Sequence, residues 1–288
     1  MGVFFKPDGT KMYVTGRTGD DVNEYNLSTA WNISTASYNQ NFSVGAQDAN
    51  PTGVSFKSDG TKMYVLGISG DAVSEYSLST AWNISTASYN QNFSVSAQET
   101  SPSGVFFKPD GTKMYVVGIV GDDVNEYNLS TAWNISTASY NQNFSVSAQE
   151  NSPTGLFFKP DGTKMYVTGQ GTDAVWAYTL STAWDVSTAS WDAPENDFFS
   201  VFANQETPTD ITFEPDGTKM YVIGSNGNTV TEYNLSTAWD VTTASYVQNF
   251  SVFAEEGSPS GLFFKSDGTQ MYVTGTFSNA VWAYDLTN

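Results

Sequence analysis

Short runs of alternating hydrophobic and polar residues, separated by Gly, Pro, Asn and Asp, extend along the whole chain. The first fifty residues contain four such runs, rich in β-branched and aromatic residues: Gly2–Lys6, Lys11–Thr15, Val22–Leu27 and about Ser37–Val44. This composition is typical of strands. Between the first two runs, Pro7-Asp8-Gly9 predicts a tight hairpin, because Pro presets φ and Gly accepts a positive φ. No segment shows a sustained helical period, so the pattern predicts an all-β protein.

The four-run pattern repeats six times. The sequence Asp-Gly-Thr-Lys-Met-Tyr-Val, or a close variant of it, begins at Asp8, Asp59, Asp110, Asp161, Asp216 and Asp267. The spacings are 51, 51, 51, 55 and 51 residues, and the longer one reflects extra residues within Trp191–Val201. We therefore expect residues 1–288 to form a single domain without a linker. Its repeats are 1–51, 52–102, 103–153, 154–208, 209–259 and an incomplete 260–288.

Stacking explains how such repeats fold. One four-stranded antiparallel sheet cannot bury both of its apolar faces alone, whereas sheets packed radially around an axis bury both. The sequence therefore predicts a six-bladed β-propeller with four-stranded antiparallel blades. The chain stops after the third strand of the sixth copy, so we expect a three-stranded last blade with Val281–Leu286 as an exposed edge. Such an edge favours self-association.

The repeat also carries a family resemblance. Residues 5–16, Phe-Lys-Pro-Asp-Gly-Thr-Lys-Met-Tyr-Val-Thr-Gly, resemble the repeat of YVTN/NHL-type β-propellers, and the resemblance covers all six copies. The copies here are longer, with an added Leu-Ser-Thr-Ala-Trp-Asn-Ile-Ser-Thr-Ala-Ser stretch at residues 27–37. Long repeats of this kind resemble those of bacterial and phage surface or tail-associated proteins. The resemblance implies adhesion or recognition. The composition, which is acidic, rich in Ser, Thr and Asn and free of Cys, separately favours an extracellular or virion surface.

Composition removes several classes of function. The chain has no Cys and no His, which excludes thiolate and imidazole chemistry in catalysis or metal binding. It has 11 basic and 30 acidic residues and a net charge of -19, which disfavours nucleic acid as a partner. No apolar run approaches the roughly 20 residues of a membrane-spanning helix. The sequence requires no cofactor.

One acidic position recurs just before the first strand of each copy. The aligned residues are Asp48, Glu99, Glu150, Gln205 and Glu256. We expect the innermost strands to begin here, and carboxylates that converge near an axis repel one another unless a cation is present. Hard oxygen ligands favour Ca²⁺. The four carboxylates are therefore candidate Ca²⁺ ligands, and a solvated acidic rim is the alternative interpretation.

A tryptophan recurs between the third and fourth runs, at Trp31, Trp82, Trp133, Trp184 and Trp239. Each indole could close the end of its blade, with lysine stems lying over it. Exposed indoles beside Asn, Ser and Thr would instead suit stacking on sugar rings, one weak site per blade, strengthened by avidity. Both interpretations remain open at this stage.

Three functions fit these observations. The first is a non-enzymatic scaffold for recognition or adhesion, with a glycan or protein ligand, because verbatim repetition supplies the same residue many times. The second is a Ca²⁺-dependent, lactonase-like hydrolase with axial carboxylates, which the chain resembles in blade number and acidity. The third is a designed or trimmed scaffold without a ligand.

Two departures from symmetry mark where a specific site would lie. Asp210 stands where other copies have Gly, and Trp191–Phe199 differs from its counterparts. The third run also has two forms. Copies 1, 2, 3 and 5 resemble Val22-Asn23-Glu24-Tyr25, whereas copies 4 and 6 have Val-Trp-Ala-Tyr, which indicates two kinds of packing between blades.

Overall fold

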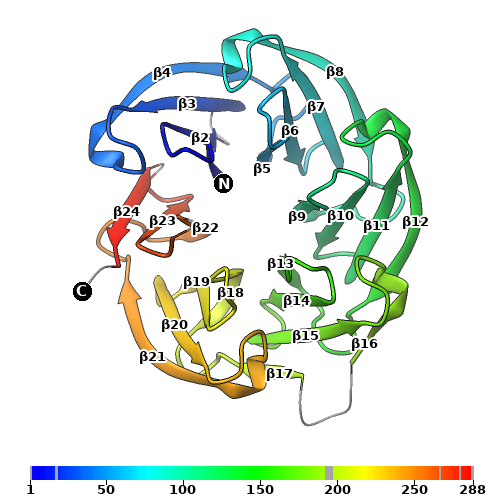
Figure 1. Cartoon of the computed structure of the whole chain (residues 1–288), viewed down its shortest axis with the longest axis vertical. Coiled ribbons are helices and arrows are strands. Elements are labelled where there is room, and N and C mark those ends of the chain that lie inside the picture. Colours follow the sequence, from blue (N-terminus) through cyan, green and yellow to red (C-terminus); the bar gives the residue numbers. More distant parts are fainter. Residues whose placement is uncertain (1, 17–18, 192–196, 266, 279, 287–288) are drawn as a thin grey trace.

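The chain forms six antiparallel sheets arranged in a ring (Figure 1). This computed structural model describes residues 2–16, 19–191, 197–265, 267–278 and 280–286. In each sheet the strands follow the order of the sequence, with the first strand nearest the centre of the ring. Blades one to five have a strand at the rim, and the sheet of blade six has three strands. The predicted six-bladed propeller with a three-stranded last blade is confirmed.

The strand bounds match the predicted runs to within one or two residues. Blade one contains β1 (Val3–Phe5), β2 (Lys11–Gly16), β3 (Asp21–Leu27) and β4 (Ala36–Ser43). Blade two contains β5 (Pro51–Phe56), β6 (Lys62–Gly67), β7 (Ala72–Leu78) and β8 (Ala87–Ser94). Blade three contains β9 (Pro102–Phe107), β10 (Lys113–Gly118), β11 (Asp123–Leu129) and β12 (Ala138–Ser145).

The other three blades differ at the rim. Blade four contains β13 (Pro153–Phe158), β14 (Lys164–Gly169), β15 (Ala174–Leu180), and a rim strand divided into β16 (Ala189–Ser190) and β17 (Phe198–Ser200). Blade five contains β18 (Glu206–Phe213), β19 (Lys219–Asn226), β20 (Thr229–Leu235) and β21 (Ala244–Ser251). Blade six contains β22 (Pro259–Phe264), β23 (Gln270–Gly275) and β24 (Val281–Asp285).

Short 3₁₀ helices precede the rim strands, and the sequence pattern did not predict them. They are η1 (Ile33–Thr35), η2 (Ile84–Thr86), η3 (Ile135–Thr137), η4 (Val186–Thr188) and η5 (Val241–Thr243). At η2, the Asn83 side chain caps the helix by accepting from the backbone N–H of Ser85. Three residues are too few to display a helical period, so only the capping residue signals such a turn.

The core lies between blades rather than within any one of them. Tyr13 and Val44 of blade one, for example, are buried together with Phe56, Met63 and Tyr76 of blade two. Each interface between neighbouring blades has a cluster of this kind, including the one that joins blade six to blade one. Radial stacking therefore buries both faces of each sheet, as the repeat pattern predicted.

Candidate functional site

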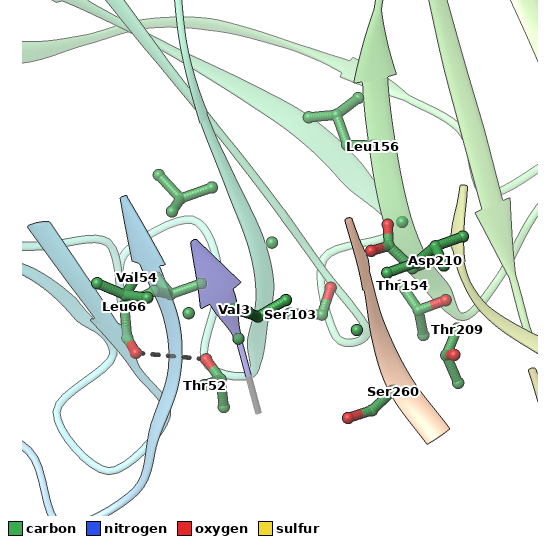
Figure 2. Close-up of a pocket in the computed structure, with 17 residues that line it drawn as sticks. Val3, Thr52, Val54, Leu66, Ser103, Thr154, Leu156, Thr209, Asp210 and Ser260 are labelled. Atoms are coloured by element: carbon green, nitrogen blue, oxygen red, sulfur yellow. Dashed lines mark hydrogen bonds between the residues drawn. The ribbon is translucent and has the colours of Figure 1, made fainter. Parts of the chain in front are cut away.

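A pocket of about 190 Å³ lies among the innermost strands of all six blades (Figure 2). Its lining is mostly glycine, small hydroxyl residues and aliphatic side chains. The residues are Gly2, Val3, Thr52, Gly53, Val54, Leu66, Ser103, Gly104, Val105, Thr154, Gly155, Leu156, Thr209, Asp210, Ser260, Gly261 and Leu262. Because every blade contributes to it, the pocket lies on the axis of the ring.

A bulge in each innermost strand from β5 onward shapes this pocket. In blade four the register shifts between Pro153 and Gly155, so Thr154 lies outside the regular ladder. Its hydroxyl donates a 3.0 Å hydrogen bond to the carbonyl of Pro208 in the next blade. Ser103 donates in the same way to Pro153, at 3.2 Å. The bulges thus connect neighbouring blades and turn hydroxyl groups towards the axis.

Among the described residues of this lining, Asp210 is the one with an ionisable side chain. It lies in β18, where the copies have glycine at the aligned positions, and it is half-buried. Burial raises the pKa of its carboxyl to about 6, although hydrogen bonds from backbone N–H groups, including that of Ile211 at 2.9 Å, oppose the shift. A carboxyl with a pKa near neutrality in a pocket is suited to proton transfer.

The four predicted Ca²⁺ ligands, Asp48, Glu99, Glu150 and Glu256, are not brought together by the fold. Each is buried and accepts hydrogen bonds from backbone N–H groups of its own blade, at the start of the first strand and in the loop after the second. Glu99, for example, accepts from Ser101 at 2.7 Å and from Gly121 at 2.9 Å. Among the described residues, no three Asp, Glu, His or Cys side chains are grouped to hold a metal ion.

The structure therefore differs from both sequence-based interpretations of this acidic column. With exposed fractions of 1% for Glu99 and 0% for Glu150, these side chains are not a solvated rim. The column instead explains the glycine that ends β6 and the glycine that ends β10. A Cβ on Gly118 would lie 2.3 Å from Cδ of Glu99, and a Cβ on Gly67 would lie 2.0 Å from Cγ of Asp48. Glycine is required there so that the carboxylate can approach the backbone.

The five tryptophans, Trp31, Trp82, Trp133, Trp184 and Trp239, each cover the glycine of their own hairpin. A Cβ on Gly111 would lie 2.3 Å from the indole of Trp133, whose ring also stacks on Phe107 with centroids 5.6 Å apart. Trp184 is buried and the other four are half-buried. Of the predicted lysine stems, Lys62 reaches the carbonyl of Trp133 at 2.6 Å. These contacts favour the interpretation in which the indoles close blade ends, and stacking on sugars remains a prediction.

Sequence reasoning identified Asp210 from its broken symmetry but missed the hydroxyl groups around it. The available signal was a Thr or Ser that follows a Pro in each copy from the second onward: Thr52, Ser103, Thr154, Thr209 and Ser260. The other asymmetric feature lies elsewhere: β17 is at the rim (Figure 1). Residues 192–196, in the middle of that predicted feature, lie outside the described residues.

Together, the ring of blades and the pocket on its axis define a β-propeller with one axial candidate site. The chain belongs to the family described as "Lactonase, 7-bladed beta-propeller", whose model matches residues 11–288. The described part of the chain contains six blades, against the seven in that description. The more specific YVTN/NHL-type assignment remains a prediction.

Solved structures share this fold at low sequence identity. A functionally unknown protein from Desulfotomaculum acetoxidans is 12% identical, with 99% of this chain and 81% of that chain covered and a TM-score of 0.64. A candidate 6-phosphogluconolactonase from Bacteroides fragilis is 15% identical, with coverages of 99% and 79% and a TM-score of 0.67. A second such candidate, from Bacteroides uniformis, is 13% identical, with coverages of 97% and 79% and a TM-score of 0.63. No curated protein matches the chain. No helix in its described part is long and apolar enough to span a membrane.

Proposed function

We propose that this protein hydrolyses a small, uncharged lactone in the axial pocket, with Asp210 as the general base. The observation that carries the proposal is the half-buried Asp210 carboxyl, the one ionisable side chain among the described residues of the pocket lining, with a pKa raised to about 6. The family membership supports a lactonase-like activity over the non-enzymatic scaffold that the repeats alone favoured.

The reaction needs one proton acceptor. The ionised carboxylate of Asp210 takes a proton from a water molecule as the water oxygen attacks the lactone carbonyl carbon. The tetrahedral intermediate collapses with cleavage of the bond between that carbon and the ring oxygen. Asp210 returns the proton to the leaving oxygen, so one lactone and one water yield one hydroxy acid. A pKa near 6 leaves the carboxyl ionised at neutral pH and still able to hold a proton during the reaction.

The charge of the pocket selects an uncharged substrate. No Lys or Arg is among the described residues that line it, and the whole chain has a net charge of -19. A phosphorylated lactone would lack a Lys or Arg partner among these described residues and would be repelled by the surrounding acidic surface. We therefore expect discrimination against phosphorylated sugar lactones, the substrates that the names of two structural neighbours point to.

Ca²⁺ has no step in this mechanism. The four carboxylates proposed from sequence as its ligands accept hydrogen bonds from backbone N–H groups of their own blades. Asp210 has the one carboxyl among the pocket-lining residues that the structure describes. The residues that the structure describes therefore do not fit a multidentate Ca²⁺ site at the axis.

The test compares glucono-δ-lactone with its 6-phosphorylated form. We expect the wild-type protein to accelerate hydrolysis of the uncharged lactone only, with kcat/KM rising through an apparent pKa of about 6. Asp210→Asn and Asp210→Gly should lower kcat by at least about 100-fold. Asp216→Asn, at an exposed hairpin of the same blade, is the matched control and should retain activity. Full activity in Asp210→Gly, or no acceleration by the wild type with any uncharged lactone, would refute the proposal.

Multivalent recognition without catalysis is the second candidate function. It is supported by exposed tyrosines that recur on the rim strands: Tyr38, Tyr89, Tyr140 and Tyr246 are 58%, 42%, 42% and 48% exposed. These side chains would offer a glycan one aromatic site on each of four blades. Binding on a glycan array, lost when the four tyrosines are replaced by Ser, would support this function.

A further inference from the structure

The rim strand of each complete blade packs against the following blade through two side chains. Phe42 of β4 lies edge-on to Tyr76 with ring centroids 5.4 Å apart, and Phe199 of β17 lies in the same way against Tyr233, at 5.0 Å. The valine two residues after each of these phenylalanines is fully buried, as at Val44 and Val201. A Phe-Ser-Val segment at the rim is thus the normal filling of an interface between blades.

The interface between blades six and one lacks this filling among the described residues. Tyr25 and Ile33 of blade one are half-buried, whereas their counterparts Tyr76 and Ile84 in blade two are fully buried. A cavity of about 290 Å³ remains at this place. It is lined by Met12, Val14, Tyr25, Ile33, Ala36, Tyr38, Ala280 and Val281.

The edge of β24 beside this cavity has the backbone groups that a strand needs. The N–H of Leu286 donates to the backbone carbonyl of Thr269 in the hairpin before β23. Counting back from Leu286, every second residue of β24 therefore directs its backbone N–H and C=O groups to β23. By the alternation of an antiparallel ladder, Val281, Ala283 and Asp285 direct their N–H and C=O groups to the open edge. The equivalent groups in blade four are used, because the N–H of Ala177 donates to the carbonyl of Asp197 at 2.7 Å.

The two forms of the third strand receive different rim strands. In the Glu form, Glu24 accepts hydrogen bonds from Asn39 at 2.8 Å and from Gln40 at 3.0 Å, both on β4. In the Trp-Ala form of blade four, Trp176 stacks on Phe198 of β17, with ring centroids 4.6 Å apart. The third strand therefore determines whether an amide or an aromatic side chain is required on the rim strand.

Blade six has the same Trp-Ala form as blade four. Trp282 aligns with Trp176, and each indole N–H donates to a hydroxyl four residues earlier, to Ser278 at 3.1 Å and to Thr172 at 2.9 Å. Ala283 and Ala177 both replace the glutamate of the other form. The open edge of β24 therefore fits a strand like β17, with an aromatic residue opposite Trp282.

We propose that the edge of β24 binds an extended segment of a partner chain that carries the pattern Phe-Phe-Ser-Val. In the register of blade four, where Val175 pairs with Phe199 and Trp176 with Phe198, the first Phe stacks on Trp282. The second Phe pairs with Val281 and fills the cavity against Tyr25, and the Val packs near Ile33. Main-chain hydrogen bonds supply affinity and the aromatic pair supplies specificity, as in other strand additions. This inference is independent of the proposed hydrolysis.

The chain itself provides matched peptide probes. Residues 197–204, Asp-Phe-Phe-Ser-Val-Phe-Ala-Asn, carry the blade-four pattern, and residues 248–255, Gln-Asn-Phe-Ser-Val-Phe-Ala-Glu, carry the amide pattern. Binding of both labelled peptides to the full chain is measured by fluorescence anisotropy. We expect the first to bind about tenfold more tightly, the preference that one aromatic pair provides. Hydrogen exchange should show new protection confined to residues 281–286.

A variant that converts the edge to the other form gives the decisive control. In blade five, Glu232 accepts from Lys219 at 2.9 Å and from Gln248 at 2.8 Å, so Gln270→Lys, Trp282→Asn and Ala283→Glu together recreate that arrangement. This triple variant should reverse the preference in favour of the 248–255 peptide. Equal binding of both peptides, protection elsewhere, or a dimer that buries β24 against a second copy would overturn the proposal.

Discussion

The phenol hydroxyl of Tyr115 in β10 donates a 2.7 Å hydrogen bond to the backbone carbonyl of Trp184, which lies 69 residues later in the next blade. The same bond recurs at four other interfaces between blades, including the one where Tyr272 donates to the carbonyl of Trp31 and joins the last blade to the first. Trp184 has a φ of 65°, in the left-handed region, which is uncommon for a residue other than glycine. This backbone conformation is the one in which its carbonyl accepts the hydrogen bond from Tyr115. The pair connects a buried core residue of one blade with the loop between the third strand and the rim strand of the next.

Replacing Tyr115 by Phe tests how much this bond stabilises the ring. The variant keeps the aromatic ring but leaves the Trp184 carbonyl without its buried donor, so we expect a loss of about 1–3 kcal/mol in the free energy of unfolding. Urea denaturation followed by circular dichroism measures it. Tyr140→Phe, at a side chain that is 42% exposed on the rim, is the control and should change stability by less than about 0.5 kcal/mol. Equal effects of the two variants would mean that the hydrogen bond contributes nothing measurable.

Gly118→Ala tests the role assigned to the buried carboxylates. The added Cβ would lie 2.3 Å from Cδ of Glu99 and 2.6 Å from the carbonyl oxygen of Ser101, so the loop must move. We expect a loss of about 1–3 kcal/mol, measured by urea unfolding. Gly53→Ala is the matched control, since its nearest contact would be an ordinary 3.7 Å to Leu66. Combining Gly118→Ala with Glu99→Ala should cost less than the sum of the two single losses, because the colliding carboxylate is gone.

The fold was predictable because its determinants are local and repeated. Asp8-Gly9 and its five copies fix the hairpins, and Gly9 has a φ of 73°, as the turn requires. The run lengths fix the strands, and the number of copies fixes the number of blades. The three-stranded sheet of blade six followed from counting the same runs.

The environment of the site residues could not be predicted in this way. The sequence showed that Asp48 and Glu99 precede the innermost strands, but not that their side chains turn back onto N–H groups of their own blades. That geometry depends on the path of two loops that meet only in the folded blade. Asp210 could be recognised because it replaces the glycine of the other copies, and this difference is visible in the sequence without any knowledge of distances.

Trp133→Ala distinguishes the two interpretations of the tryptophan column. The indole covers Gly111 and stacks on Phe107, so its removal should cost about 3–5 kcal/mol in unfolding free energy if it closes the blade end. If the indole instead serves a glycan, stability should change little while glycan-dependent quenching of fluorescence falls. We expect the first result. Trp133→Phe, which keeps an aromatic ring over the hairpin, should recover part of the stability.

The raised pKa of Asp210 predicts a specific dependence of stability on pH. Its carboxyl has an ordinary pKa of 3.8 in the unfolded chain and about 6 in the folded protein. Between these values the unfolded chain has released the proton while the folded protein still holds it. Stability is therefore lost as the pH rises from about 4 to 6, and above 6 the loss reaches its full value of about 3 kcal/mol.

Asp210→Asn isolates this contribution, because the amide cannot ionise and its oxygen can still accept the 2.9 Å hydrogen bond from the N–H of Ile211. The other 29 acidic residues titrate in both proteins, so their effects cancel when the two unfolding free energies are subtracted. Urea unfolding at pH 4, 5, 6, 7 and 8 should show the variant gaining on the wild type by about 3 kcal/mol across this range, with the change centred between pH 4 and 6. If the difference in unfolding free energy between variant and wild type stays constant with pH, the carboxyl ionises as freely in the pocket as in water. That result would contradict the role of Asp210 as the general base.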